Sequence, residues 1–114
     1  MESWKPLRLS DAERRAWEED GFFLRLAVFS AGELEDLRAA AERVVQIATR
    51  AAADPDADYA VDGNRYLEAA GATIQLEHRE GSTTVRVIEP FRHLDPRIDA
   101  VIDDPRIAEP MRDL

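Results

Sequence analysis

Between Ser30 and Ala53 the apolar residues recur with the period of a helix, and this is the most regular pattern in the chain. The apolar positions of this segment are Leu34, Leu37, Ala41, Val44, Val45 and Ala48. Ser30 and Glu33 have the spacing of a capping box, and Phe29 and Leu34 are placed for a hydrophobic staple across it. The pattern predicts a helix whose apolar side packs on the protein's own sheet. Binding of a partner by that side is the alternative, which we favour less because apolar stripes usually face the core.

The residues before this helix predict a shorter helix followed by a strand. Ser10 and Glu13 form a second capping-box pattern, and the helix is expected to end at Asp20-Gly21, because glycine readily adopts the left-handed conformation after a last turn. The following sequence FFLRL, residues 22–26, is an aromatic and aliphatic run bounded by Gly21 and Ser30. Such a short bounded run favours a buried strand over a helix.

The segment of residues 54–65 is acidic and rich in Asp, Pro and Gly, which predicts a mobile loop. Its aspartates could supply oxygen ligands to calcium, and they are Asp54, Asp56, Asp58 and Asp62. The spacing of an EF-hand loop, with Gly at the sixth position and Glu at the twelfth, is absent. We therefore interpret the segment as a solvated loop. Residues 66–70 are expected to form a helical turn.

Two strand-like runs, Thr73–His78 and Thr83–Ile88, predict a β-hairpin with residues 79–82 as its turn and Gly81 available for a positive φ. Alternation along the first run places Ile74, Leu76 and His78 on one face. In the second run, the same rule places Val85 and Val87 on a shared face. One side of the hairpin is thus expected to cover a core, and the other to face solvent or a cleft.

Two Asp-Pro pairs, Asp95-Pro96 and Asp104-Pro105, are each followed by Arg-Ile. Aspartate is a favoured N-cap and proline a favoured first helical residue, so the pairs predict two consecutive short helices. Pro110 lacks a backbone N–H and should kink or end the second helix. Because residues 111–114 include no glycine or other C-terminal cap, we expect the 114-residue chain to be a single incomplete domain.

Composition narrows the classes of function. The net charge of −9 disfavours nucleic-acid and anionic-membrane partners, which require clustered Lys and Arg. The chain has no cysteine, which excludes disulfides, thiolate metal sites and a cysteine nucleophile. Neither a signal-peptide core nor a membrane-spanning apolar run occurs in the sequence, so a cytoplasmic protein is expected.

The triplet His93-Leu94-Asp95 matches the His-x-Asp half of a 2-His-1-carboxylate iron site, and His78 could be the third ligand. Asp95, however, has a predicted role as the N-cap before Pro96. A His-x-Asp metal pair also usually lies on a strand, where residues i and i+2 face the same way, whereas here the chain enters a helix. We therefore reject His93 and Asp95 as metal ligands. His78 is interpreted as a partly buried structural histidine.

No catalytic motif of the nucleophile-elbow, P-loop or dinucleotide-binding type is present. Arg86, between two valines of the predicted hairpin, is the charged residue best placed to bind the carboxylate or phosphate of a ligand, as one wall of a substrate cleft. A solvated arginine on the wet face of the sheet is the alternative that we favour.

The order and spacing of these motifs resemble the N-terminal part of the phytanoyl-CoA dioxygenase family, which also contains ectoine hydroxylase-like enzymes. The resemblance extends over roughly residues 9–114, and its motifs are DGFFL at 20–24, FSAGEL at 29–34, VRVI at 85–88, FRHLDP at 91–96 and DPRI at 104–107. It implies a double-stranded β-helix, or jelly-roll, with N-terminal helices packed against it. It also implies hydroxylation of small molecules with Fe(II) and 2-oxoglutarate as cofactors.

In that family the iron-binding His-x-Asp follows the region present here, and a second His and an Arg that binds 2-oxoglutarate come much later. His93 and Asp95 match the family's pre-helical segment, so the resemblance assigns no catalytic or cofactor-binding residue to this chain. It implies the scaffold region of such an enzyme, inactive alone, whose partner is the remaining C-terminal part of the fold.

A free-standing α+β binding module without catalytic activity is the second hypothesis. Such a module would use an exposed sheet face or edge to dimerise or to bind a partner. Both hypotheses predict N-terminal helices, short strands and a β-hairpin, and neither identifies a substrate.

Overall fold

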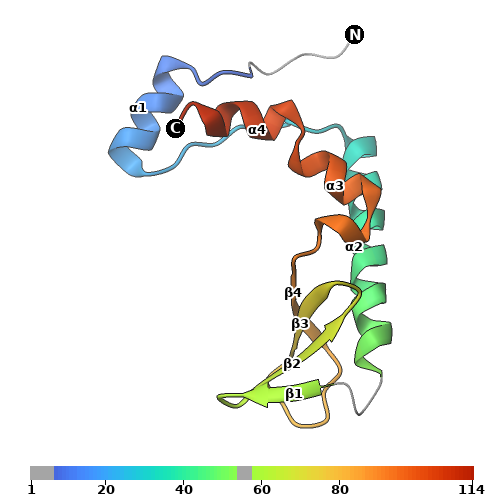
Figure 1. Ribbon diagram of the computed structural model, residues 1–114. Helices are drawn as coiled ribbons and strands as arrows, with labels where there is room; N and C mark the ends of the chain where they lie inside the picture. The colour runs from blue at the N-terminus through green and yellow to red at the C-terminus, as the bar shows by residue number, and fades with distance from the viewer. Residues whose placement is uncertain (1–6, 54–57) are drawn as a thin grey trace.

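The computed structural model describes residues 7–53 and 58–114, which form an α+β arrangement (Figure 1). The helices are α1 (Asp11–Asp20), α2 (Ala31–Ala52), the 3-10 helix η1 (Arg92–Leu94), α3 (Pro96–Ile102) and α4 (Pro105–Arg112). The strands are β1 (Asp58–Val61), β2 (Asn64–Ala69), β3 (Ala72–Leu76) and β4 (Val85–Glu89). They form one antiparallel four-stranded sheet in the order β1-β2-β3-β4.

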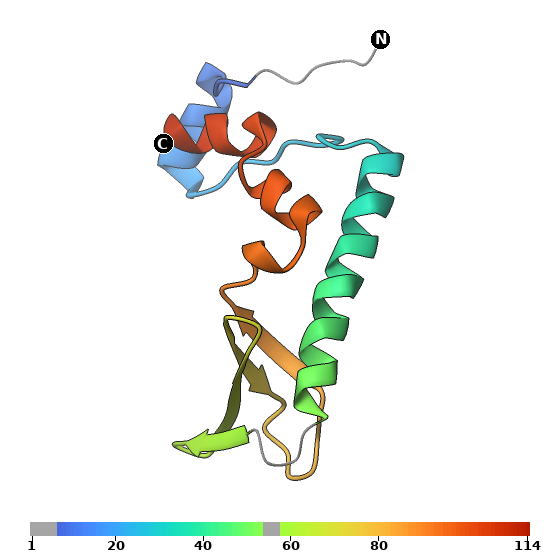
Figure 2. The ribbon, with the colours of Figure 1, turned by 45° about the vertical axis from the view of Figure 1, so that its right-hand side comes forward.

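The molecule is elongated. The sheet lies at one end, α1 and α4 lie at the other, and α2 runs along one side between them (Figures 1 and 2). The radius of gyration is 18.3 Å, whereas a compact chain of this length has about 13 Å. The fold therefore leaves a large share of its surface uncovered.

The core lies between one face of the sheet and the C-terminal half of α2. Its fully enclosed members are Ala48, Ala52, Leu67, Ile74 and Leu76. Small alanines on the helix allow the sheet to approach closely, which explains why the largest buried side chains all come from the strands. This layer fixes which face of each strand remains open.

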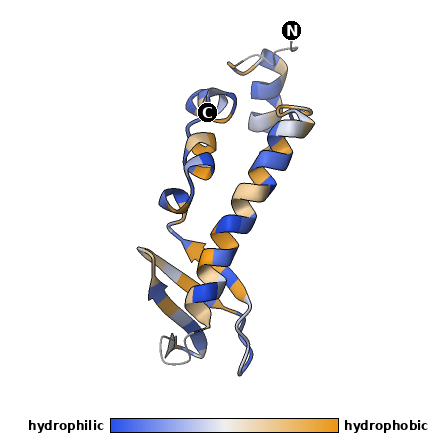
Figure 3. Cartoon of the chain, turned by 90° about the vertical axis from the view of Figure 1, so that its right-hand side faces the viewer, coloured by the Kyte–Doolittle hydropathy of each residue, from blue (hydrophilic) through white to orange (hydrophobic). Residues whose placement is uncertain are grey.

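The predicted apolar stripe of α2 is correct only in part. Val44 and Ala48 are buried, but Leu34 and Val45 are 44% and 45% exposed. The buried line instead has a strict spacing of four residues, and it consists of Ala40, Val44, Ala48 and Ala52. The N-terminal half of α2 extends past the sheet (Figure 1), which leaves Leu34 without a sheet to cover it, and Figure 3 shows apolar and polar positions along the helix.

All four predicted helix starts are confirmed. Both capping boxes are formed, with Ser10 paired to Glu13 and Ser30 to Glu33. The side chains of Asp95 and Asp104 accept backbone N–H groups of α3 and α4, each helix having Pro in its first turn. Pro110 was expected to kink or end α4, and it does not end the helix, which continues to Arg112. Proline removes a single backbone bond this close to the helix end, and its ring is buried.

The predicted buried strand at residues 22–26 is also wrong. The segment has no strand partner among the described residues, and Phe22, Leu24 and Leu26 are 60%, 77% and 75% exposed. The opposite side of the segment contacts α1, because the Arg25 guanidinium pairs with Glu13 of that helix at 2.6 Å. The short apolar run that predicted a buried strand is extended, but one side faces α1 and the apolar side faces outward.

Part of the predicted acidic loop is a hairpin. Asp58–Val61 forms β1 and Asn64–Ala69 forms β2, with Asp62-Gly63 as a two-residue turn of positive φ (51° and 81°). The helical turn expected at residues 66–70 is therefore wrong, since most of them extend β2. The calcium ligands considered at Asp54 and Asp56 lie outside the described residues.

The hairpin of β3 and β4 is confirmed, with Gly81 at φ 77° in the connection. A bulge opposite Leu76 shifts the register, so Val85 packs on the core while Val87 lies on the open face. The expectation that these two valines share a face is thus wrong. His78 follows the end of β3 and is exposed, so it is not the partly buried histidine that alternation predicted.

Ion pairs hold the end opposite the sheet together. The Asp113 carboxylate accepts hydrogen bonds from the Arg8 side chain and from the Leu9 backbone N–H. Arg106 of α4 pairs with Glu33 at 2.6 Å and stacks its guanidinium 4.4 Å from the Phe29 ring centre. These contacts join α1, α4 and the start of α2. Among the described residues, no helix is long and apolar enough to cross a membrane.

Candidate functional site

The sheet face opposite α2 is open and carries polar and aromatic side chains in two cross-strand rows. The first row, in register across all four strands, is Tyr59, Tyr66, Gln75 and Val87. The second row, across three strands, is Glu68, Thr73 and Glu89. Because side chains alternate between faces along a strand, the buried residues Leu67 and Ile74 fix these rows on the opposite side.

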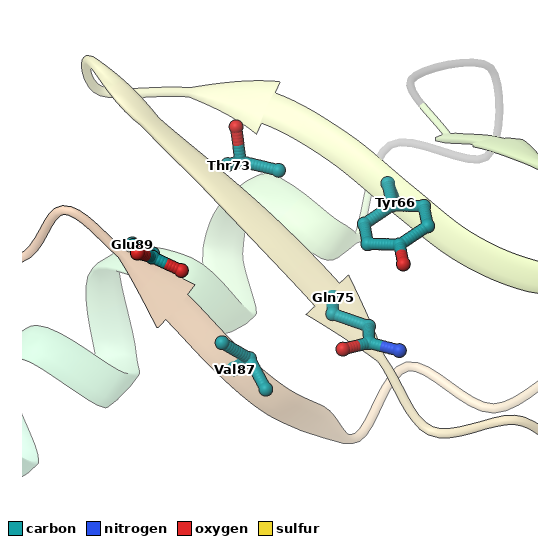
Figure 4. A pocket seen from close by; sticks show the side chains of 5 residues that line it. All are labelled: Tyr66, Thr73, Gln75, Val87 and Glu89. Carbon is teal, nitrogen blue, oxygen red and sulfur yellow. The ribbon is translucent and has the colours of Figure 1, made fainter. Parts of the chain in front are cut away.

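A hollow of about 360 Å³ lies on this face. The residues that line it are Tyr66, Thr73, Gln75, Val87 and Glu89. Figure 4 shows Glu89 and Tyr66 at opposite ends of the hollow, with the other three side chains between them. They come from β2, β3 and β4, so the bulge that turns Val87 outward helps to form the site.

One carboxylate of this face is fully engaged. The Tyr59 hydroxyl donates to Glu68 at 2.7 Å, and the Thr73 hydroxyl donates to the two oxygens of the same carboxylate at 2.9 and 2.8 Å. These hydrogen bonds lower the pKa of Glu68, and the bond from Tyr59 has the largest effect. The same bond to Glu68, followed by burial, raises the pKa of Tyr59. The Tyr59 ring also stacks on the Tyr66 ring, with centres 5.9 Å apart.

The other carboxylate is free. Within residues 7–53 and 58–114, Glu89 has no hydrogen-bond or ion-pair partner, and neither has the Gln75 side-chain amide. The hollow therefore offers a carboxylate at one end and, at the other end, an aromatic ring with an amide beside it. The sequence had indicated only that Thr73 and Gln75 face away from the core, and nothing in it distinguished Glu89 from other surface carboxylates.

The two histidines lie at opposite ends of strand β2. A side chain at Gly63, just before β2, would meet His78 at 3.3 Å, and one at Gly71, just after it, would meet His93 at 3.2 Å. The six residues of β2 span roughly 20 Å. His78 and His93 therefore cannot ligate the same metal ion.

His93 and Asp95, which the sequence brings close, have separate structural contacts. His93 Nε2 lies 2.8 Å from the Ala70 carbonyl oxygen. The Asp95 carboxylate binds the Arg43 guanidinium at 2.7 Å and accepts the Arg97 N–H at 2.9 Å as the N-cap of α3. The hydrogen bond to Arg43 is the main cause that holds the pKa of Asp95 below its ordinary value of 3.8, and the hydrogen bond from the Arg97 N–H lowers it further. The predicted capping role of Asp95 is confirmed.

Arg86 lies in β4 at the bulge and is exposed, but it is not among the residues that line the hollow. Its role in a substrate cleft stays a prediction. In the part of the chain that the structure describes, no three His, Asp or Glu side chains are grouped to hold a metal ion. His78, His93 and Asp95, as the structure places them, do not form an iron centre with two histidines and one carboxylate.

No family model, curated protein or solved structure matches this chain.

Proposed function

We propose that this chain is the N-terminal scaffold region of a cytoplasmic, phytanoyl-CoA dioxygenase-like hydroxylase of small molecules that uses Fe(II) and 2-oxoglutarate. In the complete enzyme, which has a jelly-roll fold in this proposal, the chain supplies packing helices, edge strands and one wall of the substrate cleft. The order of motifs from residue 20 to residue 107 is the basis of the family assignment. By itself the chain is inactive.

The observation that carries the scaffold role is the surface that the fold leaves open. The accessible surface is 8091 Å², whereas a compact chain of this size exposes about 6,300 Å². Part of the excess is the extended segment 22–26, which presents three large apolar side chains to solvent. An extended apolar segment of this kind suits a strand that completes a sheet in a larger protein.

Iron and 2-oxoglutarate bind elsewhere in this proposal. The two histidines at opposite ends of β2 cannot hold one iron, and Asp95 is committed to Arg43 and the α3 cap. The chemistry that such a centre supplies is the hydroxylation of an unactivated carbon. The residues of this chain contribute position and shape, and Arg86 at the β4 bulge is available to a ligand carboxylate or phosphate.

The downstream reading frame provides the first test. It should encode a His-x-Asp followed by a later His and Arg, and protein expressed from that longer frame should convert 2-oxoglutarate to succinate when Fe(II) is present. The 114-residue chain, assayed in parallel, should form no succinate. A downstream frame without these residues would leave the proposal without an enzyme. Equal activity of the short chain would overturn its scaffold role.

A free-standing α+β binding module without catalysis is the second candidate. Contacts between the two ends of the described chain favour it, because Arg8 and Leu9 bind the Asp113 carboxylate and Arg14 binds its carbonyl oxygen. Size-exclusion chromatography with light scattering and urea unfolding separates the two. A monomer or defined dimer supports the module, whereas a folded chain that self-associates without a defined size supports a scaffold that needs the rest of its fold.

A further inference from the structure

We propose that the open face of the sheet binds an organic ammonium ion with an apolar body, with Glu89 receiving the ammonium group and Tyr66 the apolar end. This inference rests on the sheet alone and does not depend on the proposed function. It concerns the hollow of about 360 Å³.

The two glutamates of this face differ in a way that selects Glu89. Glu68 already accepts hydrogen bonds from two hydroxyl groups, which occupy both of its oxygens. Glu89 lies on the other side of Thr73 in the same row and has no partner in residues 7–53 and 58–114. A primary ammonium, with three N–H donors, is the complement of such a carboxylate.

The rest of the hollow suits an apolar body. The Tyr66 ring is held in place by stacking on Tyr59, and Val87 is 39% exposed between the two ends. Gln75 adds an amide that can donate to or accept from a polar substituent. With strands about 4.8 Å apart and about 3.4 Å per residue, the Cα atoms of Glu89 and Tyr66 are roughly 12 Å apart. A ring and an ammonium joined by a few methylene groups fit that separation.

Charge favours a cation over an anion. None of the five residues that line the hollow is a lysine or an arginine. The chain as a whole carries a net charge of −9, which raises the local concentration of cations around it. A carboxylate ligand would meet Glu89 with no counter-charge in the hollow.

Three probes that differ only in their end group test the proposal on the full chain: 4-phenylbutylammonium, 4-phenylbutanol and 4-phenylbutyrate. Binding is followed by shifts of the Gln75 side-chain amide and Val87 methyl signals in NMR titrations. We expect the ammonium to bind most tightly and the carboxylate least. Glu89→Gln should weaken binding of the ammonium about two- to fivefold, the range for an exposed ion pair, and leave that of the alcohol unchanged.

Glu80→Gln is the matched control, because it removes the same charge from an exposed position in the turn between β3 and β4. It alters the net charge equally but not the hollow, so it should leave the affinity for the ammonium unchanged. Equal losses in the two variants would show attraction by net charge alone and overturn the site. The proposal also fails if the three probes bind equally or if the ammonium shifts signals only outside this face.

Discussion

The ion pair between Arg25 and Glu13 helps to hold α1 in place, together with the hydrogen bond from Arg14 to the Asp113 carbonyl oxygen, and its removal should loosen the helix. No residue of α1 is buried, so apolar packing contributes little to its position. Arg25 binds the Glu13 carboxylate through two nitrogens, at 2.6 and 2.8 Å, and also donates to the Arg8 carbonyl oxygen at 2.9 Å. Glu13→Gln keeps the size of the side chain and an acceptor for the Ser10 N–H but removes the charge. The variant should therefore expose the α1 amides to exchange more often.

The magnitude follows from the pKa of Glu13. The hydrogen bond to Arg25 is the main cause that lowers this pKa from 4.5 to about 2. Burial opposes the shift, and the hydrogen bond to the Ser10 backbone adds to it. Fully converted, this difference corresponds to about 3 kcal/mol. The side chains of Arg25 and Glu13 are still 10% and 20% exposed, so solvent screens the pair and we take about 1–2 kcal/mol. Because the folded pKa is the lower one, this stabilisation is present above pH 4.5 and is lost as the pH falls toward 2.

Native-state hydrogen exchange of the α1 amides measures the free energy needed to open α1. Near pH 7, Glu13→Gln should lower it by about 1–2 kcal/mol. Urea unfolding of both proteins near pH 2 should show the difference largely gone, because at that pH Glu13 is protonated in the unfolded chain and partly protonated in the folded one. Glu18→Gln, on the same helix and exposed, is the control and should change little. Equal effects of the two variants near pH 7, or a difference that persists at low pH, would refute the role of the Arg25 pair.

Four further variants test the fold by urea unfolding. Leu67→Ala should cost about 2–4 kcal/mol because Leu67 is 1% exposed in the core, whereas Leu24→Ala, at a 77% exposed position, should cost under about 0.5 kcal/mol. Gly71→Ala should cost about 1–2 kcal/mol, because Gly71 has φ 71° and a new Cβ would lie 3.2 Å from His93. Ser30→Ala removes the side-chain cap of α2 and should cost about 1 kcal/mol. A core substitution no more costly than Leu24→Ala would contradict the packing described.

Features that depend on a few neighbouring residues were predictable from the sequence. The capping boxes at Ser10 and Ser30 act over three residues, and the Asp-Pro caps act over two, so no tertiary information is needed to recognise them. The β3–β4 hairpin is local in the same sense. These elements were placed within one or two residues of their observed ends.

The first hairpin of the sheet was missed although its signal was present. Asp62-Gly63 is a favoured dipeptide for a two-residue hairpin turn, and both residues have positive φ here. The acidity of the surrounding segment concealed it, because charge was read as evidence for a loop. Ala70-Gly71 forms the next turn with φ 53° and 71°, and alanine gives no comparable signal.

The hollow could not be derived from the sequence. It depends on register: Gln75 lies opposite Val87 only because a bulge follows, and strict alternation puts Val87 on the wrong face. The availability of Glu89 depends on the absence of a partner nearby, and that is a property of the whole arrangement. Tyr66 was assigned to a helical turn, so its stacking on Tyr59 across two strands was out of reach.

The segment FFLRL, wrongly predicted to be a buried strand, also bears on the choice between a scaffold and a free-standing module. Its bounded apolar run predicted a buried strand, but burial needs a second layer, and residues 7–53 and 58–114 provide one only on the side of Phe23 and Arg25. Three apolar side chains exposed on an extended backbone forgo the stabilisation of burial, which is about 25 cal/mol for each Å² left uncovered. A free-standing module would have to bear that cost or cover the segment by self-association, although two copies of a chain with net charge −9 repel each other. A scaffold would recover it by pairing with the rest of its own fold, and that asymmetry is the physical reason for preferring the scaffold.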